Sequence, residues 1–191
     1  MRPIHLFILS TSLLLGSCQL STNPEGVFLV QLRKFCGEAY RGTIVSTDAI
    51  DDGWRKKTIT MHVRDCSDDE IKIALHVGED RSRTWILRHE EGRLALRHDH
   101  RHHDGTHDAV TLYGGSAETM TPTRITFPAD QSTKDMFDRE NISESKSNIW
   151  AIDVNLANDL FAYEMVRPNR NFRIEFDAST PVDAPPTPWG W

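Results

Sequence analysis

Apolar and polar residues alternate along most of this 191-residue chain. In EIKIALHV (70–77) every second residue is isoleucine, leucine or valine, and KTITMHVRD (57–65) has the same period. Successive side chains of a β-strand point to opposite faces of the sheet. A period of two therefore predicts strands that bury one face and expose the other.

Ten short segments carry this strand pattern, and turn residues such as Asp104-Gly105 and Gly114-Gly115 separate them. Most of the links have the length of a hairpin, which is typical of antiparallel sandwiches and barrels. Closure into a barrel removes the exposed edges of an open sheet. We therefore expect an all-β domain over 27–180, a single antiparallel up-and-down barrel of about ten strands, with strands at 38–46, 57–65, 70–77, 83–89, 93–101, 108–115, 123–127, 148–154, 160–166 and 172–178.

Two segments have helical character instead. VFLVQLRKF (27–35) predicts a short N-terminal helix at one end of the barrel, and ADQSTKDMFDRE (129–140), which follows a proline, predicts one further helix. The last residues, PVDAPPTPWGW (181–191), form a proline-rich tail. We expect this tail to be poorly ordered, although its two tryptophans could dock on the barrel.

The first residues resemble the signal of a bacterial lipoprotein. An apolar run too short to span a bilayer ends in LGSC (15–18), which has the pattern of a lipobox. The resemblance implies that residues 1–17 are a signal peptide and that the thiol of Cys18 is lipidated after cleavage. Gln19, in place of aspartate, implies an outer-membrane lipoprotein that faces the periplasm, with 18–26 as its tether. An ordinary signal peptide and a short core segment are the alternatives.

Charge and later hydropathy limit the partners of the chain. The formal net charge is −6, and the charges are interspersed without a basic stripe, so we expect no binding to nucleic acid. No later run is long and apolar enough to cross a membrane. The expected membrane contact is the lipid anchor alone.

Two cysteines remain if Cys18 is lipidated. Cys36 lies just before the first predicted strand and Cys66 just after the second, so an antiparallel pairing of those strands brings the two together. An even number of cysteines in an oxidising compartment favours a Cys36–Cys66 disulfide over two buried free thiols.

Two resemblances to protein families extend this interpretation. FLVQLRKFCGEAYRGTIV (28–45) looks like the start of calycin-type barrels, although Glu38 stands after Gly37 where those barrels have tryptophan. VRDCSDDE, HVGEDRSRTWIL, RHDHRHHDG, TLYGG, FPAD and FAYE resemble a group of bacterial secreted proteins and lipoproteins that have no assigned activity. The first resemblance implies ligand binding in a barrel, and the second implies export without indicating a mechanism.

Five of the nine histidines lie in RHDHRHHDGTHD (97–108). A three-residue loop ending at Gly105 pairs His100 with Asp108, and it would also align apolar residues across the two strands. His98 and His100 then face the barrel interior, because residues two apart project in the same direction. The residues between and beyond them, namely Arg97, Asp99, Arg101 and His107, are expected to form a solvated charge ladder outside.

His98, His100 and Asp108 are the candidate site residues. Two imidazoles and a carboxylate could bind one divalent transition metal (zinc, iron, manganese or copper). Alternatively they could form an inward polar network without a metal, or the histidines could simply be solvated at the tip of a polar hairpin. The spacing resembles the first cupin motif, but that family needs a later histidine and there is none after His107. It also resembles the histidine motif of metallo-β-lactamase-type hydrolases, which need an α/β fold. His62 and His76 are expected outside the barrel rather than as third ligands.

Other chemistry is weakly indicated. The acidic loop beside Cys66, formed by Asp65, Asp68, Asp69 and Glu70, could hold calcium, but its spacing does not fit an EF-hand and a solvated turn is favoured. The sequence therefore favours a lipid-anchored periplasmic barrel that binds a small ligand or a metal ion without covalent chemistry. A metal-dependent enzyme with a His-x-His and carboxylate site and a purely structural envelope lipoprotein are the alternatives. No catalytic residue is assigned, and the oligomeric state stays open.

Overall fold

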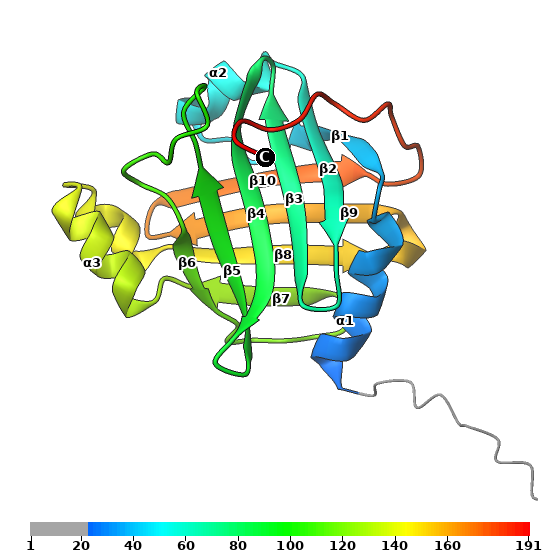
Figure 1. The fold of residues 1–191 in the computed structure, drawn as a ribbon, viewed down its shortest axis with the longest axis horizontal. Helices are drawn as coiled ribbons and strands as arrows, with labels where there is room; N and C mark the ends of the chain where they lie inside the picture. The colour runs from blue at the N-terminus through cyan, green and yellow to red at the C-terminus, as the bar shows by residue number, and fades with distance from the viewer. Residues whose placement is uncertain (1–22) are drawn as a thin grey trace, which may run out of the picture.

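The protein folds into one ten-stranded antiparallel sheet that curls into a nearly closed barrel (Figure 1). The computed structural model describes residues 23–191. The strands follow the order β6-β5-β4-β3-β2-β1-β10-β9-β8-β7, so that every pair joined by a turn lies side by side. Their bounds are β1 Ala39–Ile44, β2 Ile59–Cys66, β3 Glu70–Val77, β4 Asp80–Glu90, β5 Arg93–His100, β6 Tyr113–Ser116, β7 Arg124–Pro128, β8 Ile149–Asn155, β9 Leu160–Arg167 and β10 Arg170–Asp177.

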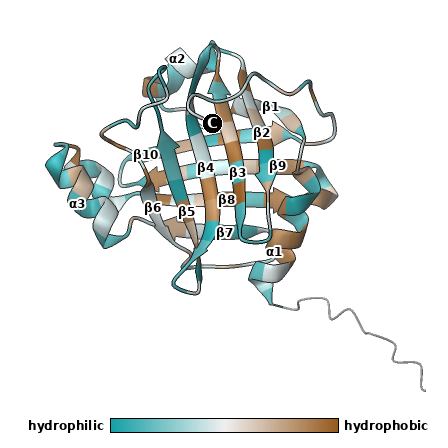
Figure 2. Cartoon of the chain, viewed as in Figure 1, coloured by the Kyte–Doolittle hydropathy of each residue, from teal (hydrophilic) through white to brown (hydrophobic). Residues whose placement is uncertain are grey.

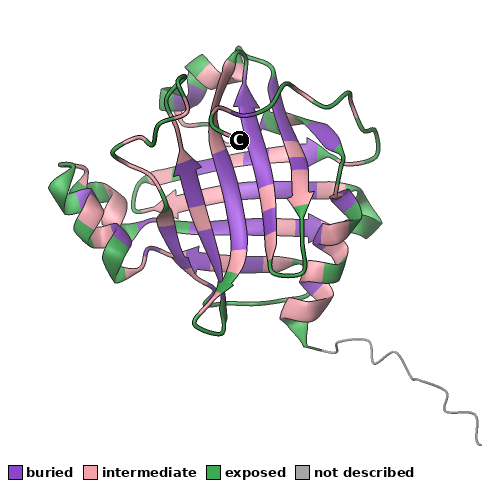
Figure 3. Cartoon of the chain, in the orientation of Figure 1, coloured by how far each residue is buried: buried purple, intermediate pink, exposed green. Residues whose placement is uncertain are grey.

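The predicted barrel and its two helices are confirmed. The period-two pattern works because one face of each strand is buried: Ile71, Ile73, Leu75 and Val77 are at most 2% exposed. Figure 3 shows buried segments along the strands and exposed residues at the turns, and Figure 2 shows the corresponding hydrophobic bands. The helices are α1 Pro24–Leu32, α2 Asp52–Arg55 and α3 Gln131–Arg139, with short 3-10 turns at η1 Arg33–Phe35, η2 Ala49–Asp51, η3 Ser143–Ser147 and η4 Leu156–Asn158.

Helix α1 packs its apolar side onto one part of the barrel core. Phe28 and Leu32 of α1 and Phe35 of the following turn η1 are at most 3% exposed, and the Phe35 ring meets Phe161 edge to face with ring centres 6.1 Å apart. Asn23 caps the helix by accepting a hydrogen bond from the Gly26 amide, so the helix begins at Pro24. The start lies earlier than expected, and the last residues of the predicted 18–26 tether are helical.

The predicted signal peptide 1–17 and lipidation site Cys18 lie outside the described residues. Over 23–191 there is no helix with the length and apolar character that a membrane span needs.

The proline-rich C-terminal segment docks on the outer face of the barrel, which corrects the expectation of poor order (Figure 1). Val182 forms a β-bridge with Ala39, and the Trp189 amide donates to the carbonyl oxygen of Arg81. The Trp191 indole N–H donates to Asp99 Oδ2 at 2.9 Å.

The expectation of a solvated charge ladder on β5 is therefore wrong for Asp99, which is 1% exposed. Its carboxylate is covered by Trp191 and paired with Arg101 at 2.7 Å. The Lys72 and Arg101 cations lie 4.3 and 4.6 Å from the centre of the Trp191 ring. A buried carboxylate is tolerated here because charged and polar donors surround it.

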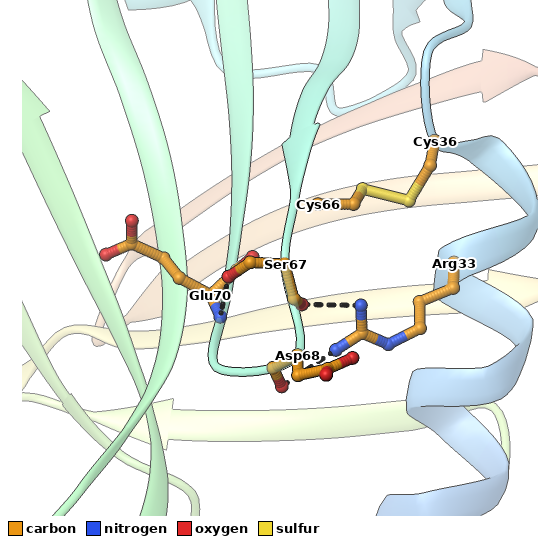
Figure 4. The surroundings of a disulfide bond; sticks show 6 residues. All are labelled: Arg33, Cys36, Cys66, Ser67, Asp68 and Glu70. Carbon is orange, nitrogen blue, oxygen red and sulfur yellow. Dashed lines mark hydrogen bonds between the residues drawn. A yellow bond between two sulfur atoms is a disulfide. The ribbon is translucent and has the colours of Figure 1, made fainter.

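Cys36 and Cys66 form the expected disulfide (Figure 4). Their Cα atoms are 6.1 Å apart, because the start of β1 lies beside the end of β2. Arg33 donates to the carbonyl oxygens of Ser67 and Asp68 at 2.6 and 3.0 Å. Within residues 23–191 no three acidic side chains converge in a way that could hold a metal ion, so the calcium alternative gains no support.

Loss of this disulfide should lower the free energy of unfolding by about 3–4 kcal/mol, because it closes a loop of 30 residues in the unfolded chain. Urea denaturation of a Cys36→Ser/Cys66→Ser protein, compared with its parent, measures the change. In a Cys18→Ala background, thiol labelling of the unfolded, unreduced protein should modify no cysteine. Two labelled thiols would show that the pair is reduced.

Candidate functional site

A cavity of about 260 Å³ lies inside the barrel, where α2 and α3 flank the ends of the strands. Residues from seven strands line it, together with α2, α3 and their neighbouring turns. The α1 side chains that fill the core elsewhere do not reach it. The barrel is therefore packed near α1 and hollow toward α2 and α3.

Aromatic rings form a large part of the cavity wall. Trp85 stacks on Tyr163 with ring centres 4.2 Å apart, and His98 stacks on Tyr113 at 4.6 Å. The Trp150 ring lies 4.9 Å from His98. Flat side chains on several sides make the cavity suited to a planar ligand.

His98 faces inward as predicted and is 2% exposed. Its Nδ1 lies 3.1 Å from the Tyr113 carbonyl oxygen, and its Nε2 lies 2.8 Å from the Tyr163 hydroxyl. Because a carbonyl can only accept, Nδ1 carries the hydrogen and Nε2 accepts from Tyr163. Burial, and next the neighbouring His100, lower the pKa of His98 to about 3, so this ring is neutral at pH 7.

His100 also lines the cavity, as predicted, and is half-buried. Its Nε2 lies 3.2 Å from the Tyr113 hydroxyl. Burial, followed by the charge of Arg83, lowers its pKa to about 4. Burial also raises the pKa values of Tyr113 and Tyr163, so both hydroxyls keep their protons and can donate.

Two arginines bring charge to the cavity. Arg83 donates from Nη1 to Asp80 at 2.5 Å, and its guanidinium lies 4.7 Å from the centre of the Trp54 ring. Arg170 pairs with Asp51 at 2.7 Å and with Asp48 at 2.9 Å. Arg170 is therefore engaged by two carboxylates and Arg83 by one.

The predicted register of the histidine hairpin is right near the turn and wrong further along. The His102 amide donates to Thr106, and the Asp108 amide donates to His100, as a three-residue loop requires. Beyond that point the second strand bulges, and His98 pairs with Tyr113 instead of Val110. Apolar alignment could not reveal this bulge, in which Leu112 adopts a φ of 56°.

Asp108 does not complete a metal site with the two histidines. Its Oδ1 accepts from the Val110 amide at 3.0 Å and so holds the bulge in shape. Both ring nitrogens of His98 have partners within the barrel. Nowhere in residues 23–191 do three or more histidine, cysteine or acidic side chains converge in a way that could hold a metal ion.

His62 and His76 lie on the outer face of the sheet as expected. His62 is half-buried, and His76 is 4% exposed and borders a second hollow beside Pro185 and Pro186 of the C-terminal segment. Neither contributes to the cavity.

Sequence reasoning missed Trp85, Tyr163 and Arg83. A signal for Tyr163 was present, since it shares the buried face of LFAYEMV with Phe161 and Met165. A tyrosine on an inward face needs a hydrogen-bond partner inside the barrel. That requirement could have paired it with an inward histidine.

Comparisons with models of protein families, with curated proteins and with solved structures found no match for this chain. The two resemblances of the sequence therefore stay predictions, and the geometry of the cavity carries the functional argument.

Proposed function

We propose that this protein is a lipid-anchored β-barrel of the bacterial cell envelope that binds a small, planar and largely apolar ligand, without covalent chemistry of its own. The observation that carries the proposal is the cavity of about 260 Å³ with aromatic walls and a few polar groups. Its size is just below the range of about 300–1,000 Å³ common for small-molecule sites, so the ligand is compact.

The polar groups of the cavity support binding rather than a purely structural role. A structural barrel fills its interior with close-packed side chains, whereas this one leaves Tyr113, His100 and Arg83 beside open space. Such isolated polar groups in an apolar wall fix the orientation of a ligand.

The metal-dependent alternative is not supported by the positions of its predicted ligands. Both ring nitrogens of His98 have hydrogen-bond partners, and the Asp108 carboxylate accepts a hydrogen bond from the Val110 amide in the bulge of the hairpin. We therefore assign no step to a metal ion.

The proposed location follows from the sequence. LGSC at 15–18 supports lipidation at Cys18, and a disulfide between Cys36 and Cys66 is consistent with an oxidising compartment. The proposed partners are the outer membrane through the anchor and a small molecule in the barrel.

Blocking the cavity tests the proposal. Val110 lines the cavity from the irregular part of the hairpin, so Val110→Trp should fill the space while the strands stay paired. We expect isothermal titration calorimetry to detect binding of 2-naphthalenemethanol by the parent and none by the variant, with little change in Tm. Val45→Trp is the matched control, because Val45 is exposed and away from the cavity. No binding by the parent, or equal binding by the blocked variant, would refute the cavity as the site.

A further inference from the structure

We infer that the ligand is a compact aromatic carboxylate whose ring lies among the aromatic walls and whose carboxylate pairs with Arg83. This inference rests on the proposed function and names the class of ligand for the same cavity. It depends on which charged groups in the cavity still have free hydrogen-bonding capacity.

Arg83 is the cation with free donors. It lines the cavity near the start of β4, directly across from His100 on β5. Only its Nη1 donates to a described residue, Asp80, and its Nε and Nη2 are neither buried nor hydrogen-bonded within 23–191. A guanidinium can bind two carboxylates through different edges, so Arg83 can hold Asp80 and a ligand together.

Arg170 has less of this capacity, because both of its terminal nitrogens are engaged. Its Nη1 donates to Asp48, Asp51 and the carbonyl oxygen of Asn171, and its Nη2 donates to Asp51. A ligand carboxylate at Arg170 would have to displace two acids that are already in place. The anionic end is therefore expected at Arg83.

The acids of the cavity argue against a cationic ligand. Among the described lining residues Asp51 is the single carboxylate, and Arg170 already pairs with it. An aromatic wall alone can attract a cation, but the Arg83 guanidinium already lies over the Trp54 ring and would repel a second positive charge.

The neighbouring groups complete a site for an anion. The Tyr113 hydroxyl keeps its proton and lies 3.2 Å from His100 Nε2, so it can donate to the ring or to a carboxylate oxygen. Trp85, Tyr163, His98 and Tyr113 line the cavity, so the parts of these rings that face it can contact the ring of the ligand. A planar acid thus finds a surface for its ring and donors for its charge.

Three probes of matched shape test the class of ligand: 2-naphthoate, 2-naphthalenemethanol and 2-naphthylmethylamine. Calorimetry at pH 7.5 should show 2-naphthoate binding about tenfold or more tightly than the alcohol, because a hydrogen bond to a charged group contributes more than a neutral one. The amine should bind least. Arg83→Gln should reduce the affinity for naphthoate to that for the alcohol, and Arg83→Lys should keep part of the preference. Arg88→Gln is the control, because Arg88 lies on the same strand but pairs with Glu90 away from the cavity.

The outcomes separate the two proposals. If the alcohol or the amine binds as tightly as naphthoate to the unaltered protein, the inference is overturned and the binding function stands. If naphthoate is preferred but Arg83→Gln keeps the preference in a folded protein, the assigned role of Arg83 is wrong. If none of the three probes binds, the proposed function fails with it. The three affinities measured on the unaltered protein decide the class of ligand even where a variant does not fold.

Discussion

Lowering the pH from 7.5 to 5 should reduce the free energy of unfolding by about 4–6 kcal/mol. Burial is the first cause that lowers the pKa values of His98, His100 and His76, to about 3, about 4 and about 4. In the unfolded chain a histidine has a pKa of about 6.5. Between pH 6.5 and 5 these histidines therefore become protonated in the unfolded state and stay neutral in the folded state. Each buried histidine then lowers the free energy of unfolding at pH 5 by up to about 2 kcal/mol.

The sign of this effect follows from the direction of the shifts. The contribution of the neutral histidines to the free energy of unfolding is fully present above about pH 6.5. It falls as the pH drops below that value and continues to fall until the folded-state pKa values of about 3 and about 4 are reached. Burial and the charge of Arg83 lower the pKa of His100, and the opposing charges of Asp108, Asp99 and Asp80 do not overcome them.

Urea denaturation at several pH values between 7.5 and 5 measures the effect. His98→Gln should reduce the change in the free energy of unfolding between pH 7.5 and 5 by the contribution of one histidine. The substitution should also lower the free energy of unfolding at every pH. His102 is exposed at the hairpin tip, so the profile of His102→Gln should run parallel to that of the unaltered protein. A stability that stays constant down to pH 5.5 would contradict neutral, buried histidines.

The sequence was sufficient to predict the barrel because burial repeats every second residue. Nine of the ten strands were expected near their observed positions, and β3 has the predicted bounds, 70–77. The exception is β6, which was expected over 108–115 and spans Tyr113–Ser116. Its first half bulges instead, where Asp108 caps Val110 and Leu112 adopts a left-handed conformation, and no glycine marks the place.

The site could be predicted only in part, for a related reason. Alternation shows which face a residue lies on, so the inward direction of His98 and His100 followed from the pattern. It does not show which strands meet across the barrel, and Tyr163 reaches His98 from 65 residues away. The same holds for the C-terminal segment, since no periodicity links Trp191 to Asp99.

Gly115→Ala should destabilise the protein by about 4 kcal/mol or more, because β6 passes the end of β7 without room for a side chain. A Cβ at Gly115 would lie 1.9 Å from the carbonyl oxygen of Pro128 and 3.2 Å from the Asp130 amide nitrogen. Neither neighbour is a flexible side chain, so the backbone of one strand must move by more than an ångström. Overpacking of this kind belongs to the few mechanisms that give effects of this size.

The cost is high because this position closes the barrel. β6 and β7 form the two ends of the ten-stranded sheet, and they are not consecutive partners in its ladder. Next to Gly115, the Gly114 carbonyl oxygen accepts from the Asp130 amide at 3.0 Å and from the Thr133 hydroxyl at 2.9 Å. A shift of β6 would break these bonds and expose the two sheet edges that closure removes.

Gly53→Ala provides the matched control, because Gly53 lies in α2 and a Cβ there meets no atom within 4 Å. Alanine has the higher helix propensity, so this variant should keep or slightly raise the Tm. Urea denaturation of both variants gives the comparison, and a folded Gly115→Ala protein with unchanged stability would mean that β6 and β7 do not approach so closely. Closure at this seam also sets the position of Tyr113, two residues before Gly115, so the same shift should weaken ligand binding before the barrel unfolds.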